Sequence, residues 1–177
     1  MRPLLIAATL FLASCGFRPL HQEVAPATST ALAPLTSLRI DAGYRDDADD
    51  KRAAFLITQS LRERLGADSP TPRYTLTLTP RVSRAGLGVG ANDVASRFDY
   101  NIFTAYRLLD AKSGEEVARG SVYSVATFGA PADPFGRISA EVNAAEQASR
   151  QAADEIVTEL ALHFADMGAD AEQDSAE

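Results

Sequence analysis

Three stretches of the chain have the pattern of hydrophobic and polar side chains that is expected of β-strands. The clearest is residues 74–79, in which Tyr or Leu alternates with Thr. The second, from Arg97 to Leu109, also alternates, and the third, from Val117 to Phe128, returns after the turn-forming sequence Asp110–Gly114 with apolar residues on both faces. Such alternation is typical of strands that bury one face. Together with the short apolar stretch Leu38–Ile40, it predicts a sheet of four strands.

Two other stretches have the three-to-four-residue spacing of helices. The first leads from the acidic cluster Asp46–Asp50, which suits a helix N-terminus, to Gly66, which suits a left-handed cap. Its apolar residues are Ala54, Ile57, Leu61 and Leu65. The second helix is predicted to have Ser139 as its N-cap and to end at Gly168. Its apolar stripe consists of Ile138, Val142, Ala145, Ala152, Ile156, Leu160 and Phe164.

The order of these elements predicts an α+β fold, with two helices packed on one face of a four-stranded, largely antiparallel sheet (β-α-β-β-β-α). Pro80 lacks an amide donor, which indicates an edge or a bulge near the end of its strand. The glycine-rich segment Ala85–Ala91 is expected to be a flexible hairpin tip. The strand Val117–Phe128 is apolar on both faces, which favours either a central strand or a sheet whose second face meets a partner.

The first residues have the features of an export signal. Arg2 precedes the apolar run Leu4–Leu12, which is too short to cross roughly 30 Å of hydrocarbon. The run leads into Leu-Ala-Ser-Cys at residues 12–15, the pattern of a bacterial lipobox. The alternative is an ordinary secretory signal with a chance cysteine. Lipidation is favoured because the single cysteine of the chain lies at the one position that the modification requires.

We therefore predict a signal peptide over residues 1–14 and a mature protein that begins at Cys15, modified with S-diacylglycerol and an N-acyl group. Residues 15–34 lack either hydrophobic period and are expected to form the lipidated N-terminus and a tether. A single domain is predicted over 35–167, followed by a disordered acidic tail over 168–177. Gly16 stands where an Asp would signal retention at the inner membrane, which favours the outer membrane, with the protein lipid-anchored on its periplasmic side.

Charge and composition exclude several classes of partner and site. The net charge of −7 argues against nucleic acid, whose binding needs concentrated Lys and Arg. One cysteine allows no intramolecular disulfide and no thiolate metal cluster. The acidic cluster Asp46–Asp50 lacks the ligand spacing of an EF-hand, so helix capping is favoured over a calcium loop. We predict neither a cofactor nor a metal site.

Catalytic groups are scarce, and no catalytic residue is predicted. His21 lies in the tether and His163 near the end of the last helix, where neither has an evident Ser or Cys partner. Asp99 is the best single carboxylate, but an ion pair with Arg97 explains it more simply. A divergent hydrolase using Asp99 or His163 is kept as an alternative.

Binding is therefore the expected activity. In a meander of strands, the tip that joins the second and third strands lies at the same end of the sheet as the loop that leaves the fourth. Arg84, Arg97 and Arg137 lie on or beside these connections and could converge on one anionic ligand, since the guanidinium group pairs in a bidentate way with phosphate oxygens. The alternative is that each is a separate solubilising charge.

The chain resembles the lipopolysaccharide-assembly lipoprotein family LptE. The resemblance begins with the lipobox and Cys15-Gly16-Phe17-Arg18-Pro19-Leu20, and continues through the strand that ends in Ile40-Asp41. It includes the helix before Gly66, the Leu76/Leu78 strand, the strand with Asp99-Tyr100 and the closing helix.

This resemblance implies a non-enzymatic protein that plugs and helps to assemble the outer-membrane β-barrel LptD, binds lipopolysaccharide and takes part in its transport to the cell surface. In that family, basic residues that bind the ligand lie at the tip between strands two and three and in the loop before the last helix. Arg137 matches the second position. At the tip this chain has Gly90, Ala91 and Asn92, with Arg97 nearby. A different class, an outer-membrane lipoprotein that regulates a peptidoglycan synthase, is the alternative, although its members usually need a longer tether.

Replacement of Cys15 by Ala should release the protein from the membrane into the periplasm. Each buried methylene of an acyl chain contributes ~0.8 kcal/mol, and several chains together give durable anchoring. Fractionation of the C15A variant, with Thr28→Ala in the tether as the control, measures the change. Mass spectrometry of the native protein should find an acylated Cys15, and an unmodified cysteine would contradict the prediction.

Overall fold

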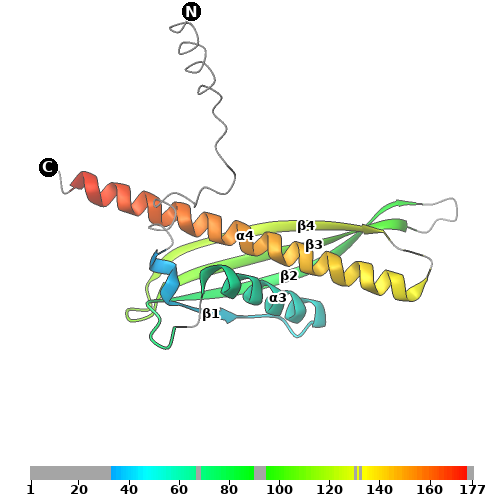
Figure 1. Ribbon diagram of the computed structural model, residues 1–177, viewed down its shortest axis with the longest axis horizontal. Helices are drawn as coiled ribbons and strands as arrows, with labels where there is room; N and C mark the ends of the chain where they lie inside the picture. Colours follow the sequence, from blue (N-terminus) through cyan, green and yellow to red (C-terminus); the bar gives the residue numbers. More distant parts are fainter. Residues whose placement is uncertain (1–32, 67–68, 90–94, 130, 132, 175–177) are drawn as a thin grey trace, which may run out of the picture.

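The structure, a computed structural model, describes residues 33–66, 69–89, 95–129, 131 and 133–174 (Figure 1). In chain order its elements are the 3₁₀ helix η2 (Ala33–Ser37), β1 (Leu38–Ala42), α3 (Ala48–Leu65), β2 (Tyr74–Val89), β3 (Ala95–Asp110), β4 (Glu116–Gly129) and α4 (Pro134–Asp174). This α+β order of strand, helix, three strands and helix confirms the predicted fold class.

The four strands form one sheet in the order β1-β2-β3-β4. β1 pairs in parallel with β2, whereas the other two pairs are antiparallel, so the sheet is mixed. α3 is the crossover that the parallel pair requires. Both helices lie on the same face of the sheet, α3 against β1 and β2 and α4 against β3 and β4, and they also pack against each other (Figure 1). The opposite face, called the open face below, has no second layer within the part of the chain that the structure describes.

The core lies between the helices and the sheet. From β2 and β3 it takes alternate side chains: Tyr74, Leu76, Leu78, Tyr100, Ile102, Tyr106 and Leu108. From α4 it takes a stripe of buried small residues: Ala144, Ala145, Ala148, Ser149, Ala152 and Ala153. Small side chains let the helix backbone approach the sheet closely. Each fully buried Leu or Ile contributes about 1.5–3 kcal/mol.

The two ends of α3 confirm the capping that the sequence predicts. The Asp47 side chain accepts hydrogen bonds from the backbone N–H groups of Asp49 and Asp50, at 2.9 and 3.2 Å. Gly66 ends the helix in the left-handed conformation, with φ of 62°. The remaining carboxylates of the cluster also have protein partners, since Asp46 pairs with Lys51 and Asp50 accepts from Val82 N–H at 2.8 Å.

β2 is longer than predicted, although Pro80 does lie at an edge. β1 pairs with β2 only as far as Leu78, whose carbonyl accepts from Gly43 N–H. Pro80, two residues later, directs its ring nitrogen to the same side, where β1 has ended, so its missing N–H removes no ladder bond. The strand therefore continues to Val89. The expected flexible tip was wrong for residues 85–89, and residues 90–91 lie outside the described residues.

β4 is an edge strand, so of the two interpretations that the sequence allowed, that of a central strand was wrong. The buried face of β4 carries Val122, Ala126 and Phe128 under α4. The apolar residues of its other face, Tyr123 and Val125, lie on the open face, where Tyr123 is 58 % exposed. The alternative interpretation, a sheet whose second face meets a partner, stays open.

α4 begins earlier and ends later than predicted. Its first turn is capped by the Asp133 carboxylate, which accepts from the N–H groups of Phe135 and Gly136, rather than by Ser139. Gly168 does not end the helix, because one exposed glycine costs only about 1 kcal/mol and good helix formers follow it. The helix continues to Asp174, so the predicted disordered tail was wrong for residues 168–174.

The apolar stripe of α4 also starts later than predicted. Ile138 was placed on it, but this side chain is 62 % exposed, and the buried residues of α4 begin at Ala144. Neither helix contains a stretch long and apolar enough to span a membrane, among the residues that the structure describes. The predicted signal peptide (1–14), Cys15 and the tether up to residue 32 lie outside the described residues.

Candidate functional site

Arg84 joins four elements of the fold. From β2, its Nη1 lies 2.8 Å from Asp49 Oδ2 in α3, and its Nε donates to Glu141 Oε1 in α4 at 2.7 Å. Its guanidinium carbon lies 5.5 Å from the ring centroid of Tyr100 in β3. All five donors of the guanidinium belong to a planar fork that can serve two carboxylates at once. Arg84 is therefore a clamp between the helices and the sheet.

The electrostatics of this cluster keep Arg84 charged. The hydrogen bond with Asp49 raises the pKa of Arg84, burial lowers it by less, and the bond with Glu141 raises it further. Burial raises the pKa of the neighbouring Tyr100 to about 12, so this phenol stays protonated at physiological pH. Because Arg84 is paired with both Asp49 and Glu141, it is not a free cation.

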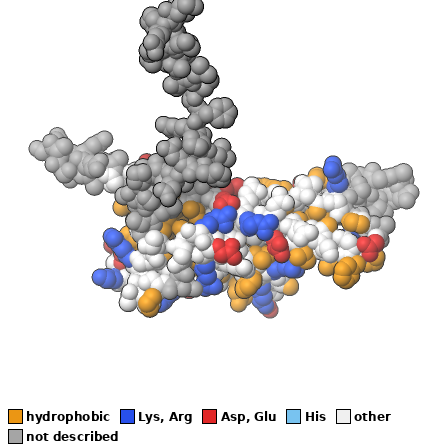
Figure 2. Space-filling view, viewed as in Figure 1, with side chains coloured by type: hydrophobic (Ala, Val, Ile, Leu, Met, Phe, Trp, Pro, Cys, Tyr) orange, Lys and Arg blue, Asp and Glu red, His pale blue; other side chains and the backbone are white. Residues whose placement is uncertain are grey.

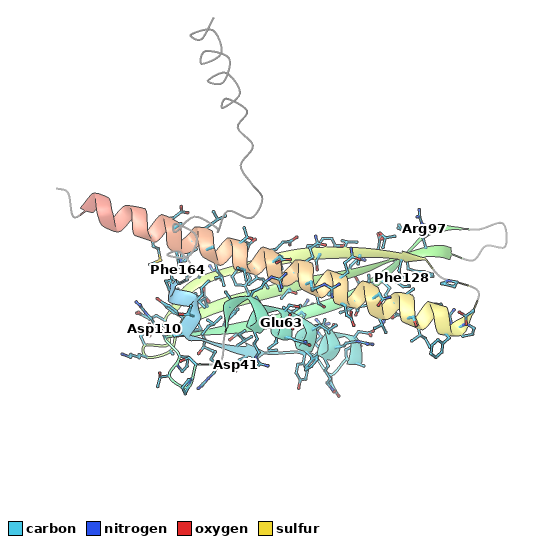
Figure 3. All side chains as sticks on the ribbon, viewed as in Figure 1. Asp41, Glu63, Arg97, Asp110, Phe128 and Phe164 are labelled. Carbon is cyan, nitrogen blue, oxygen red and sulfur yellow. The ribbon has the colours of Figure 1, made fainter. Side chains whose placement is uncertain are left out.

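The structure does not bring the three predicted arginines together. Arg97 lies near the start of β3 (Figure 3), opposite Leu87 and Gly129 in the register. It alternates with the inward-facing Phe98 and so lies on the open face, whereas Arg84 contacts both helices on the other face. Arg137 is exposed in the first turns of α4, which start at the same end of the molecule. Within the described residues neither Arg97 nor Arg137 forms an ion pair. Gly90, Ala91 and Asn92 lie outside those residues.

Asp99 and His163, the two residues of the alternative hydrolase interpretation, both contact neighbouring side chains of the fold. Asp99 Oδ1 accepts from the Thr127 hydroxyl at 2.6 Å, and the expected ion pair with Arg97 does not form. The ring of His163 packs edge-on against Phe164, at 5.7 Å between centroids. In the described ranges there is no group of three or more His, Cys, Asp or Glu side chains that could hold a metal ion.

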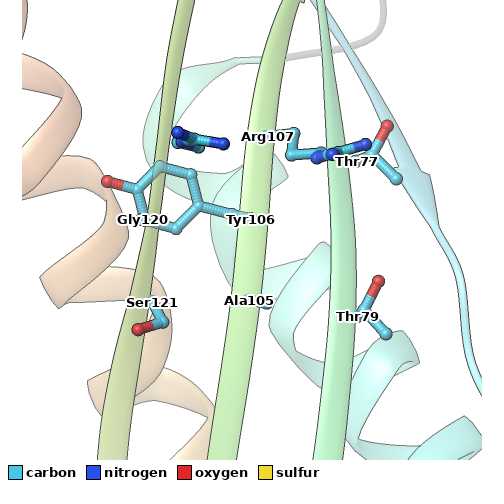
Figure 4. A pocket seen from close by; sticks show the side chains of 8 residues that line it. Thr77, Thr79, Ala105, Tyr106, Arg107, Gly120 and Ser121 are labelled. Carbon is cyan, nitrogen blue, oxygen red and sulfur yellow. The ribbon is translucent and has the colours of Figure 1, made fainter.

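The open face carries a groove of about 650 Å³ that crosses three strands (Figure 4). Thr77 and Thr79 line it from β2, and Ala105 and Ser121 form its floor from β3 and β4. At one end stand Arg107 and Arg119, which face each other across the strands. Both approach one carboxylate, Glu116, with N–O distances of 3.3 and 3.5 Å. The groove therefore combines hydroxyl groups with a local excess of positive charge.

A row of three large side chains crosses the open face beside this groove. Arg81, Phe103 and Tyr123 are paired in register on β2, β3 and β4. Phe103 is 42 % exposed and Tyr123 58 % exposed. The Tyr123 hydroxyl donates to Asn101 Oδ1 at 3.0 Å, which holds the ring against the sheet and covers the Asn101 side chain. Sequence reasoning missed this row, since only the register aligns it; the apolar second face of β4 was the one available signal.

Figure 2 shows the opposite, helix-covered face. Cationic and anionic side chains are interspersed over its middle, and hydrophobic side chains gather at the end where α4 begins. Phe135 and Ile138 in that part of α4 are 81 % and 62 % exposed.

One family model matches most of the folded part of this chain. The model of LptE, described as lipopolysaccharide-assembly, matches residues 35–160. No curated protein matches the sequence. A crystal structure of a Caulobacter crescentus CB15 protein described as a lipoprotein is 28 % identical with a TM-score of 0.60, covering 78 % of this chain and 97 % of that chain.

Two further structures are similar in fold. Rare lipoprotein B from Shewanella oneidensis has a TM-score of 0.54 at 16 % identity, covering 73 % of this chain and 98 % of its own. Protein XCC0632 from Xanthomonas campestris has a TM-score of 0.51 at 17 % identity, with 79 % and 87 % covered.

Replacement of Arg84 by Gln should destabilise the fold, because the carboxylates of Asp49 and Glu141 would lose their shared partner. We expect a loss of about 1–2 kcal/mol, limited by the partial exposure of all three groups. Thermal unfolding of the domain measures it. The double variant R97Q/R137Q is the control and should unfold like the wild type; an unchanged midpoint for R84Q would contradict the clamp.

Proposed function

The chain belongs to the LptE family of lipopolysaccharide-assembly proteins, and on this basis we propose that it is the lipoprotein partner of an LptD-type β-barrel in the outer membrane. The observation that carries the proposal is the family match over residues 35–160, which includes every strand and both helices at least in large part. The lipobox-like sequence that ends in Cys15 precedes this body and supplies the anchor. The protein would act by binding, as a plug and assembly factor for the barrel.

The arrangement of the fold supports a binding role. The sheet has one face covered by α3 and α4 and one broad face without a layer, and the open face carries partly exposed aromatic rings. A plug must remain folded while its surface contacts the polar lumen of a barrel. A two-layer body with a stable core and an uncovered polar and aromatic face meets both requirements.

Binding of lipopolysaccharide is the second part of the proposal. Arg97 and Arg137 are exposed at the end of the molecule where α4 begins, and their guanidinium groups are available for phosphate. Phe135 and Ile138 beside Arg137 would meet the apolar part of a lipid. Arg84, which we predicted as a third ligand residue, is engaged with Asp49 and Glu141 and would instead position the start of α4.

The barrel partnership is tested by affinity purification of the full-length lipidated protein from outer membranes in mild detergent. A large β-barrel should co-purify in a fixed ratio, and depletion of the protein should leave lipopolysaccharide in the periplasm. A lone monomer would contradict the proposal. A peptidoglycan synthase without a barrel would favour the alternative function.

The ligand site is tested with the double variant R97D/R137D. Its affinity for purified lipopolysaccharide should fall at least tenfold at fixed salt, because two cationic contacts become repulsive, while thermal unfolding stays unchanged. The control K112D/R150D has the same change in charge, with Lys112 in the β3–β4 turn and Arg150 in the middle of α4. Equal affinities for both double variants would discard the assignment of Arg97 and Arg137.

A further inference from the structure

The open face has the dimensions of a protein interface. β2, β3 and β4 are 14–16 residues long, so their shared face covers roughly 700 Å² at the usual rise and spacing of strands. A stable interface of standard size buries about 800 Å² on each partner. A single small headgroup could fill the groove but would leave the aromatic row uncovered.

The centre of this face is an ordered aromatic anchor. Phe103 and Tyr123 lie side by side on adjacent strands, and Arg81 flanks Phe103 in the same row. Aromatic and Arg side chains are the residues that most often supply the binding energy of interfaces. The bond from Tyr123 to Asn101 fixes one ring before any partner arrives, which lowers the entropy cost of association.

The charge of the open face differs in sign from that of the whole protein. Its described charged side chains are the basic residues Arg39, Arg81, Arg97, Arg107 and Arg119 and the acidic residues Asp41, Asp99 and Glu116. Five cations against three anions give an excess of positive charge on this face, in a chain whose net charge is −7. The complementary surface is therefore acidic.

The groove would be the point where this complementarity is strongest. Arg107 and Arg119 both pair with Glu116 and with no other carboxylate of the described residues, and their side chains are largely exposed, at 65 % and 74 %. The hydroxyl groups of Thr77, Thr79 and Ser121 line the floor and walls beside them. An incoming carboxylate can therefore pair with a guanidinium while its second oxygen accepts from a hydroxyl group.

We propose that the open face of the sheet is the surface that docks the barrel partner, with Phe103 and Tyr123 as anchors and with Arg107 and Arg119 receiving acidic side chains of that partner. This inference rests on the proposed function and names the face of the protein that serves it. α3 and α4 then stabilise the sheet from behind.

The test is co-purification of the barrel with full-length lipidated variants, at fixed salt. R81E/R119E should reduce the recovered barrel at least tenfold, and F103A/Y123A should do the same. The matched controls are R45E/R52E, an equal change in charge at exposed positions before and within α3, and F55A, which removes an aromatic ring that is 66 % exposed on α3. The controls should recover the barrel like the wild type.

The outcomes separate this inference from the proposed function. If the wild-type protein recovers no barrel, the proposed function fails. If the wild type recovers the barrel and the open-face variants recover it equally well, only the docking surface is overturned. If those variants keep the barrel but lose lipopolysaccharide, the groove is a glycolipid site, which also overturns the docking proposal. Thermal unfolding of each variant shows whether a loss of binding is a loss of folding.

Discussion

The packing of α4 on β3 and β4 determines which surface of this protein can meet another molecule. A stripe of alanines with one serine lets the long helix lie close against the sheet, and α3 fills the remainder of the same face. Because both helices pack on one face of the sheet, no helix or second sheet covers the other face in the described part of the chain. The alternation of every strand follows from this, with leucines and buried aromatic rings under the helices and threonine, arginine and partly exposed rings opposite.

Side chains at the start of α3 bind to the part of β2 that has no neighbouring strand on one edge. Beyond Leu78, one edge of β2 has no neighbouring strand, because β1 ends at Ala42. Asp50, which is 5 % exposed, satisfies Val82 N–H on that edge, and Asp49 holds Arg84 two residues further on. The acidic cluster therefore caps its own helix, ties that helix to the strand and, through Arg84 and Glu141, reaches α4. A cluster that resembles a metal loop in sequence is used here for packing.

Most of the fold could be predicted from periodicity and end signals. The Leu76/Leu78 alternation, the α3 caps at Asp47 and Gly66, and the order of elements are local features, and they were confirmed. Predictions failed where a neighbouring element, rather than the local sequence, determines where a strand or helix ends. Pro80 and the glycines after it are typical of a strand end, but the unpaired edge of β2 tolerates them. Gly168 is typical of a helix end, but good helix formers follow it and α4 continues. The position of β4 within the sheet could not be predicted either, because its apolar second face suits both a central strand and an edge strand that faces a partner.

The candidate sites likewise combine features that the local sequence reveals with features that only the pairing of strands reveals. Arginines can be counted in a sequence, but the face of the sheet to which each belongs depends on whether it is odd or even along its strand, which separates Arg97 from Arg84. The row of Arg81, Phe103 and Tyr123 depends on the register between three strands, which no local signal reveals.

Photo-crosslinking in intact cells, with a photoreactive amino acid at Tyr123 of the full-length lipoprotein, would show which molecule the open face meets. We expect an adduct with an outer-membrane β-barrel that is stronger than the one formed from position Phe55 on α3. An open face that forms no adduct, in cells where the protein is lipidated and folded, would contradict the docking proposal.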